Sequence, residues 1–240
     1  MELVIATFNI QNKYKLKNYS GVDEFGNHVK SLVDFINHYH IDILGVQELT
    51  KPYKNNLYSL LSKDYMITGK YRFTSLGNLI PIIKKYNESN SIITRYPLLD
   101  SDTKRLPFFP NIPRIITCTS FVIHDRKIRI YNTHLDQKSD TIRKKQLKMI
   151  LSIIEKSRSE CVLMGDFNCS IKHEYFNHFV DEMENLNMKL VKIEKPTHKK
   201  RKYPIDHIFV PRDWKVKEKS VVEVGMKTSD HMPIVVKLQI

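Results

Sequence analysis

The sequence predicts an α/β protein, because short β-branched runs alternate with a few amphipathic helical segments along its 240 residues. Hydrophobic residues make up 41% and charged residues 27% of the chain, as in ordinary folded proteins, and no repeat or low-complexity linker divides it. Many polar residues able to do chemistry stand at the ends of the β-branched runs, where a rigid scaffold can hold them. We therefore expect one domain over residues 1–240, with a functional site on one rim.

The expected strands are runs of about four to nine residues that are rich in Ile, Val, Phe or Thr and end at polar residues or proline. They are Leu3–Asn9, Ile41–Gln47, Ser91–Thr94, Ile115–Ile123, Ile128–Thr133, Cys161–Asp166, Ile205–Val210 and Ile234–Leu238. Polar residues follow several of these runs directly. This placement would turn scattered sequence positions into one site.

Three segments carry apolar residues at helical spacing: His28–Tyr39, Ser139–Lys156 and His173–Glu184. Ser139 or Asp140 is a plausible N-cap for the second of these helices. The Lys and Arg residues of that helix lie off its apolar stripe, and we interpret them as a solvated face.

The formal net charge is +13, with a pI near 9.5. A surplus of this size attracts nucleic acid, anionic lipid or other polyphosphates. A lysine-rich composition throughout the source genome would give the same surplus, so charge alone does not name a substrate.

The cysteines and the N-terminus bear on location. Cys118, Cys161 and Cys169 are odd in number and have no CxxC spacing, which argues against a disulfide framework and a cysteine zinc site. The first apolar run is too short for a signal peptide, and nowhere do about 18 apolar residues run together. We expect a cytoplasmic monomer without stable membrane insertion.

The strongest local motif is Met164–Asn168, which follows the buried run Cys161–Leu163. Asp166 and Asn168 point the same way if the chain stays extended. Asp166 could then accept a proton from water or orient the water, while Asn168 holds the water or a phosphate oxygen. An Asx turn at the strand end would give the same pattern.

Two histidines also stand beside strands. His134 closes the run Ile128–Thr133 and could donate a hydrogen bond to a phosphate oxygen, although a satisfied loop histidine is the simpler alternative. His231 precedes the last expected strand and is a candidate general acid or base, because its reference pKa lies near neutrality. Asp206 is a candidate carboxylate to orient it.

Glu48 stands at the end of an apolar strand, where an unpaired acid costs free energy unless a cation lies beside it. Mg²⁺ fits this place, because it prefers hard oxygen ligands and retains waters. Asn9, which closes the first strand, could add an oxygen contact. An Arg or Lys partner for Glu48 is the alternative.

Taken together and in this order, the motifs resemble the endonuclease/exonuclease/phosphatase family, which includes deoxyribonuclease I, exonuclease III and bacterial sphingomyelinases. The matching segments are Thr7–Asn9, Gln47–Glu48, Asn90–Pro97, Asn132–Leu135, Gly165–Asn168, Ile205–Ile208 and Ser229–Pro233. The resemblance covers nearly the whole chain, and the ordered set is far more specific than any single motif.

The resemblance implies a four-layer α/β sandwich, in which two packed mixed β-sheets are flanked by helices. It also implies a Mg²⁺ cofactor, with Mn²⁺ as a possible substitute. Glu48 would be the main metal ligand, and Asn9 and Asp230 would lie near the metal.

The catalytic roles are also implied by the resemblance. Asp166 would activate or orient the attacking water, helped by Asn168. His231, oriented by Asp206, would serve as acid/base or phosphate contact, and His134 would brace the phosphoryl oxygens. A phosphodiester is anionic and repels hydroxide, so such a site needs charge neutralisation and an aligned water.

The departures from the family pattern concern the substrate. Ser89 stands where many members have Gly, Gln11 stands where the exonuclease III branch carries an acid, and Trp214 is the only tryptophan. Arg114 resembles an arginine of several small bacterial members and is expected to contact phosphate, with a surface salt bridge as the alternative. Asn90, at the start of a matching segment, is also expected to contact substrate.

The segment Lys195–Lys202 has five Lys or Arg residues and no acid, and it immediately precedes the Asp206 strand. We interpret it as a polyanion-binding segment near the site, with Lys199, Lys200 and Arg201 as substrate contacts. A solvated loop is the alternative.

We therefore predict a Mg²⁺-dependent phosphodiesterase, with nucleic acid as the favoured substrate for reasons of charge. A phospholipid head group or a small phosphate ester is the alternative within the same chemistry. A nucleic-acid-binding module that has lost catalysis is the alternative of another class.

Overall fold

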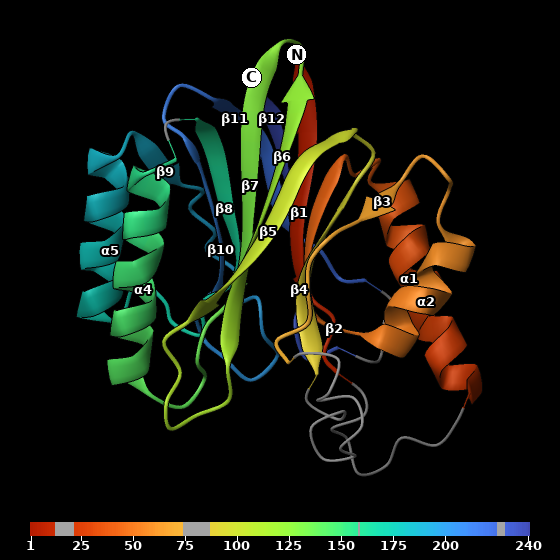
Figure 1. Ribbon diagram of the computed structural model, residues 1–240, viewed down its shortest axis with the longest axis horizontal. Helices are drawn as coiled ribbons and strands as arrows, with labels where there is room; N and C mark the ends of the chain where they lie inside the picture. Colours follow the sequence, from red (N-terminus) through yellow and green to blue (C-terminus); the bar gives the residue numbers. More distant parts are fainter. Residues whose placement is uncertain (13–21, 74–86, 158, 225–228) are drawn as a thin grey trace.

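The computed structural model describes residues 1–12, 22–73, 87–157, 159–224 and 229–240. In this part of the chain, two mixed six-stranded sheets pack face to face, and helices cover both outer surfaces (Figure 1). This architecture confirms the four-layer sandwich that the resemblance implied.

The first sheet contains the strands nearest both chain ends. In spatial order its strands are β11 (Lys215–Val221), β12 (Ile234–Gln239), β1 (Glu2–Asn9), β2 (Ile43–Thr50), β4 (Glu88–Thr94) and β3 (Met66–Ile67). Helices α1 (Val22–His38) and α2 (Lys51–Leu60) cover its outer face. None of the described helices combines the length and apolar character needed to cross a membrane.

The second sheet carries the other half of the chain. In spatial order its strands are β5 (Leu98–Leu106), β6 (Arg114–Ile123), β7 (Arg126–His134), β8 (Glu160–Asp166), β10 (Asp206–Pro211) and β9 (Met188–Leu190). Helices α4 (Asp140–Glu155) and α5 (Glu174–Asn185) cover its outer face. The Ser139 hydroxyl accepts a hydrogen bond from Ile142 N at 3.3 Å, so the predicted cap is present.

Side-chain alternation along the strands builds the core in three layers. On β1, Leu3 and Ile5 enter the layer between the sheets, whereas Ala6 and Phe8 pack under the helices of the first sheet. A third apolar layer lies between the second sheet and its helices. Both sheets are therefore buried on two faces, which explains why their central strands read as continuous apolar runs.

Every expected strand is present, with ends that differ by at most three residues, and helix α1 begins six residues before its predicted start. The sequence patterns did not predict α2, β3, β5, β9 or β11. β5 and β11 lie at sheet edges and are largely exposed and charged, so they lack the apolar alternation that marks a half-buried strand. α2 buries only Tyr53 and Leu57.

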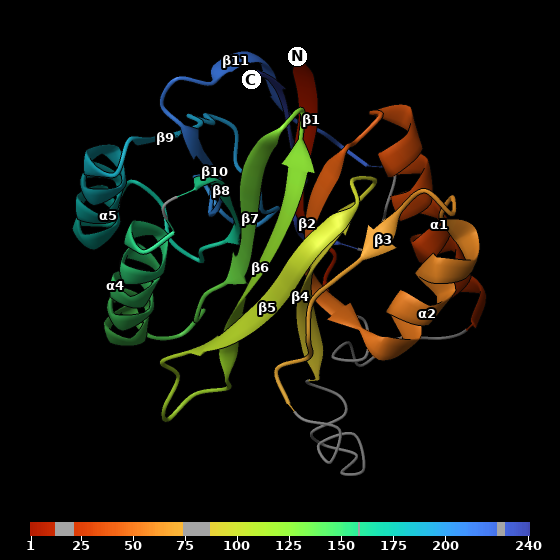
Figure 2. The ribbon, with the colours of Figure 1, turned by 45° about the horizontal axis from the view of Figure 1, so that its top comes forward.

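The strand directions gather the polar strand ends at one edge, opposite the two termini (Figures 1 and 2). Asn9 is aligned with Gln47 in the parallel pair β1–β2. In the second sheet, Asp166 is aligned with His134 on one side and with Asp206 on the other. Three candidate site residues therefore lie side by side on adjacent strands, about 4.8 Å apart.

Gly165 is required by the close approach of β8 to β7 beneath this edge. Its φ is +143°, and a Cβ there would lie 2.0 Å from the carbonyl oxygen of Thr133. We expect Gly165→Ala to lower the free energy of unfolding by roughly 3 kcal/mol or more. The control is Gly26→Ala on helix α1, where an added Cβ meets nothing within 4 Å. We expect this substitution to raise the free energy of unfolding by roughly 0.5–1 kcal/mol. Urea denaturation measures both, and equal midpoints would contradict the prediction.

Candidate active site

Asp166 is the centre of the polar cluster at this edge, and donors converge on its carboxylate. Its Oδ2 accepts a hydrogen bond from Asn9 Nδ2 at 3.0 Å and lies 3.3 Å from His134 Nε2 and 3.6 Å from His231 Nε2. Its Oδ1 accepts from the backbone N–H of Asn168 at 2.9 Å. A buried carboxylate surrounded by donors is a suitable place to bind and orient a water.

His231 is oriented by Asp206. Its Nδ1 lies 2.9 Å from Asp206 Oδ2, and both side chains are almost fully buried. With Nδ1 bound to the carboxylate, Nε2 points toward Asp166 and the cleft. The pairing predicted from the sequence is therefore present in the geometry, although its catalytic role stays a prediction.

Glu48 reaches the site through a β-bulge. Between Val46 and Leu49, two residues of β2 oppose one residue of β4, and Glu48 itself has a φ of +63°. Its Oε2 accepts a hydrogen bond from Asn12 N at 2.7 Å, and its Oε1 lies 4.0 Å from His134 Nδ1. The side chain is 11% exposed, so one carboxylate of the first sheet is presented to the cleft.

A polar network joins the two sheets behind these residues. Gln47 Nε2 donates to Asn132 Oδ1 at 2.7 Å, and Asn132 Nδ2 donates to the carbonyls of Val46 and Ser91 at 2.9 and 2.7 Å. The first sheet carries Glu48 on one side of the cleft, and the second sheet carries Asp166 on the other side. The network that joins the two sheets therefore fixes the distance between these two sides.

Burial and charge shift the titration of the central groups. Burial, with a smaller contribution from Asp206, raises the pKa of Asp166 above its usual range. Burial alone would lower the pKa of His231, but the carboxylates of Asp206 and Asp166 outweigh it, so the pKa of His231 is raised. At neutral pH the site therefore holds a cationic, hydrogen-bond-donating imidazole beside a carboxylate with increased proton affinity.

Arg114 lies in the floor of the cleft. It is 6% exposed, and among the described residues its Nε and Nη1 have no hydrogen-bond partner. Burial and the neighbouring guanidinium of Arg72 lower the pKa of Arg114 to about 10, although Glu88, Glu48 and Asp166 act in the opposite direction. Buried guanidinium N–H groups without an acceptor among the described residues are suited to bind the oxygens of an anionic ligand.

These residues line one cleft of about 420 Å³. The sequence-predicted residues that line it are Asn9, Glu48, Arg114, His134, Asp166, Asn168, Arg201, Asp230 and His231. Asp206 lies directly behind His231. Residues at sequence distances of more than 200 positions therefore share one pocket.

Three predicted substrate contacts are not among the lining residues. Asn90 is buried between the sheets, where its Nδ2 donates to the carbonyl of Ile115 at 2.7 Å. Lys199 and Lys200 are exposed on the segment that precedes β10. Of the predicted basic contacts in this segment, only Arg201 lines the cleft.

The structure adds lining residues that were not predicted to be site residues from the sequence. They are Asn12, Arg72, Gln137, Lys138 and His198, together with Gln11, Ile112 and Ile205. Most stand in loops without a periodic pattern, so only proximity to a motif could have indicated them. His198 was within the basic segment already noted, and Lys138 follows the His134 motif by four residues.

The donor set suits a divalent cation. Glu48 supplies a hard carboxylate oxygen that is partly open to the cleft. Among the described residues, two groups of His and Asp side chains also have their potential ligand atoms within 4.8 Å of one another. They are His198–Asp230–His231 and Asp166–Asp206–His231. In both, His231 uses Nδ1 to bind Asp206, and its raised pKa favours protonation of Nε2, which disfavours metal ligation by this histidine.

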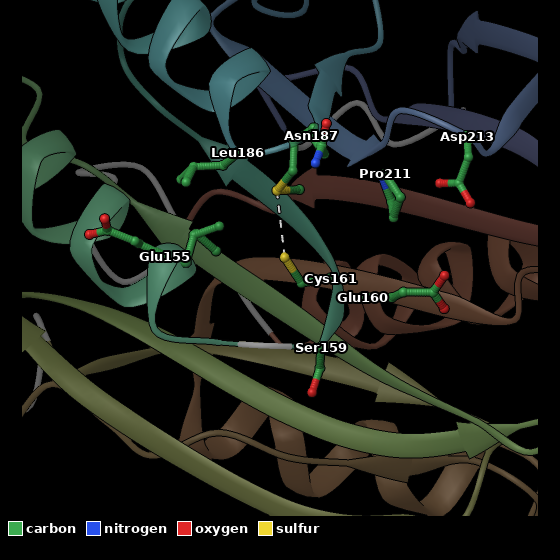
Figure 3. A pocket seen from close by; sticks show the side chains of 10 residues that line it. Glu155, Ser159, Glu160, Cys161, Leu186, Asn187, Pro211 and Asp213 are labelled. Carbon is green, nitrogen blue, oxygen red and sulfur yellow. Dashed lines mark hydrogen bonds between the residues drawn. The ribbon is translucent and has the colours of Figure 1, made fainter.

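A second hollow, of about 330 Å³, opens at the opposite end of β8 (Figure 3). Cys161 Sγ lies 3.5 Å from Met188 Sδ there, and burial raises the pKa of Cys161 to about 12, so its thiol stays protonated. Glu160 is paired with Arg126. This arrangement offers no activated nucleophile, and we assign no chemistry to it.

Comparisons with known proteins agree with the geometry. The model of the endonuclease/exonuclease/phosphatase family matches residues 6–231. No curated protein sequence matches the chain.

Solved structures share the fold. An endonuclease/exonuclease/phosphatase family protein from Bacteroides thetaiotaomicron has a TM-score of 0.82 at 20% identity, covering 99% of this chain and 97% of that one. A mannosyl-6-phosphatase from Bacteroides thetaiotaomicron VPI-5482 has a TM-score of 0.81 at 19% identity, covering 99% and 100%. TDP2 from D. rerio, in complex with a single-strand DNA product, has a TM-score of 0.72 at 16% identity, covering 100% and 99%.

Proposed function

The chain belongs to the endonuclease/exonuclease/phosphatase family, whose members are phosphoester hydrolases generally dependent on a divalent metal, and on this premise we propose that it is a Mg²⁺-dependent phosphodiesterase acting on nucleic acid. The observation that carries the proposal is the convergence of Asn9, His134 and His231 on the Asp166 carboxylate, beside the open carboxylate of Glu48.

Asp166 is the proposed acceptor for the attacking water. Its raised pKa increases its affinity for the proton that the water loses, and hydrogen bonds from Asn9 and Asn168 hold its orientation. Water oxygen forms the new bond to phosphorus, its proton passes to Asp166, and the leaving oxygen departs on the opposite face.

His231 is the proposed donor to a phosphoryl oxygen. Attacking and leaving oxygens lie on opposite faces of phosphorus in an in-line displacement, whereas His231 Nε2 is only 3.6 Å from Asp166 Oδ2. His231 therefore acts on the same face as the attacking water, as a cationic donor to a non-bridging oxygen. His134, between Glu48 and Asp166, donates beside it.

Glu48 is the proposed Mg²⁺ ligand, with Asn9 and Asp230 near the metal. When bound, Mg²⁺ would neutralise charge on the phosphoryl oxygens. Arg114 provides N–H donors on the floor for which the described part of the chain offers no acceptor, and Arg201 provides a cation on the rim.

Exposed aromatic side chains on two loops that also supply lining residues to the cleft favour nucleic acid over a small ester. Phe109, on the loop before β6, is 87% exposed, and that loop also supplies Ile112 to the cleft lining. Tyr203 is 44% exposed, with Lys172 Nζ 5.0 Å from its ring centroid. Aromatic faces next to cations are a common platform for unpaired bases.

A substrate panel tests the proposal. It comprises single-stranded DNA, RNA, supercoiled plasmid, sphingomyelin, inositol phosphates, mannose 6-phosphate and a nitrophenyl phosphodiester, each with Mg²⁺ and with chelator. We expect Mg²⁺-dependent cleavage of a nucleic acid. Turnover confined to a small ester or a lipid would reject the proposed substrate, and turnover unaffected by chelator would reject the proposed cofactor.

A further inference from the structure

A short segment, Thr197–Lys199, runs antiparallel to Asp230–Met232, and we refer to it as the strap. Lys199 N donates to the carbonyl of Asp230 at 2.8 Å, and Met232 N donates to the carbonyl of Thr197 at 2.7 Å. His198 and His231 form the bridge between these two bonds. The strap therefore fixes the backbone that carries His231.

Thr197 also holds the partner of His231. Its buried hydroxyl accepts hydrogen bonds from Ile205 N and Asp206 N, both at 3.1 Å. One residue thus binds the Asp206 backbone with its side chain and the segment after His231 with its carbonyl. The 2.9 Å contact between Asp206 and His231 joins two segments that meet at Thr197.

His198 orients Asp230, the acid that directly precedes His231. Its Nδ1 accepts a hydrogen bond from Lys200 N at 2.9 Å, so the neutral ring carries its proton on Nε2. Nε2 lies 3.3 Å from Asp230 Oδ2 and can donate to it. The ring also packs edge-on against His231, with centroids 4.7 Å apart and planes at 83°. This tautomer makes His198 a donor to Asp230, not a metal ligand.

We propose that Thr197 and His198 are positioning residues, which align Asp206 and Asp230 around His231 without touching the substrate's reacting atoms. The proposal rests on the proposed hydrolytic function for its kinetic readout and on the geometry alone for its structural one. Because the strap continues directly into Lys200–Lys202, it also joins these basic residues to the backbone that carries His231.

Thr197→Val tests the hydroxyl, because valine keeps the shape and removes the acceptor. We expect kcat on the best substrate of the panel to fall about 10- to 100-fold with KM changed less than about threefold. Thr197→Ser keeps the acceptor and should restore kcat to within about threefold of the parent. The matched control is Thr119→Val, the same change at a buried threonine of β6 whose hydroxyl contacts Thr68, and its kcat should equal that of the parent.

His198 is tested in the same way. His198→Gln retains an N–H donor for Asp230, so this variant should keep most of the parent kcat. His198→Leu has no such donor, so this variant should lose most of the parent kcat. Thermal unfolding of each variant shows whether it is folded at the assay temperature. A folded Thr197→Val protein with unchanged kcat, or a Thr197→Ser protein as slow as Thr197→Val, would overturn the role of Thr197. Equal kcat for His198→Leu and the parent would overturn that of His198.

An activity-independent measurement separates this inference from the proposed function. The His231 ring proton bonded to Asp206 should give a downfield NMR signal, identified by its loss in His231→Gln. We expect the signal in the parent, Thr197→Ser and Thr119→Val proteins and its loss or displacement in Thr197→Val. If the signal behaves so while no substrate is hydrolysed, only the proposed function fails. An unchanged signal in Thr197→Val rejects the inference.

Discussion

Glu48→Gln is expected to lower kcat by about 10²–10³ and to raise the Mg²⁺ concentration needed for half-maximal activity. Glutamine keeps the size of the side chain and its hydrogen-bonding oxygen toward Asn12 N, but removes the negative charge that faces the cleft. The loss should therefore reflect the cation and not the fold. Initial rates over a Mg²⁺ titration measure both effects.

A binding experiment provides a second readout for Glu48. Mg²⁺ should raise the unfolding temperature of the parent protein, because a ligand that binds only the folded state stabilises it, and should do so much less for Glu48→Gln. Glu155→Gln, the same change on the exposed end of α4, is the control and should behave like the parent. An Mg²⁺ response of Glu48→Gln equal to that of Glu155→Gln would remove Glu48 from the proposed metal site.

The site residues that could be predicted from the sequence are those whose reactive side chains stand at the ends of strands. Asp166, His134 and Asp206 close or open strands of one sheet, so a correct strand assignment almost determines that they meet. Glu48 is different, because alternation along β2 does not indicate where a bulge will place it. The sequence predicted it at the end of a strand, whereas β2 continues to Thr50 and a bulge within the strand presents Glu48 to the cleft.

The remaining lining residues depend on contacts that no local pattern encodes. Arg72 is held in a buried ion pair with Glu88, and Asn12 links Glu88 to Glu48 through its side chain and backbone. None of these three stands in a periodic segment that predicts such pairing. Asn90 shows the reverse, because its place in a family motif suggested substrate contact, whereas its amide binds Ile115 between the sheets.

Of the seven described non-glycine residues with positive φ, three line the same cleft. Gln11, Glu48 and Asn168 line it and have φ values of +52°, +63° and +53°, a conformation that L-residues seldom adopt. Each lies just after a strand or in a bulge, where the chain must turn to aim a polar group inward. The fold thus retains local strain at the place where ligand-facing groups are needed.

Asp206→Asn is the substitution that best distinguishes the possible roles of His231. Asparagine preserves the shape beside Nδ1 but removes the charge that raises the pKa of His231. The pKa of His231 then falls, because burial is opposed only by the remaining carboxylates of Asp166 and Asp230. If His231 acts as a cationic donor, kcat should fall about 10²–10³, and the loss of activity on the alkaline side should begin at lower pH.

The pH profile decides between donor and base. A base must be unprotonated, so a lower pKa would extend activity toward acid pH and leave the alkaline side unchanged. The double variant Asp206→Asn/His231→Gln adds a second criterion. If Asp206 acts through His231, the double variant should be little slower than His231→Gln alone, whereas independent roles would multiply the two losses. Multiplied losses, or a shift of activity toward acid pH, would contradict the assignment of His231 as the charged donor beside Asp166.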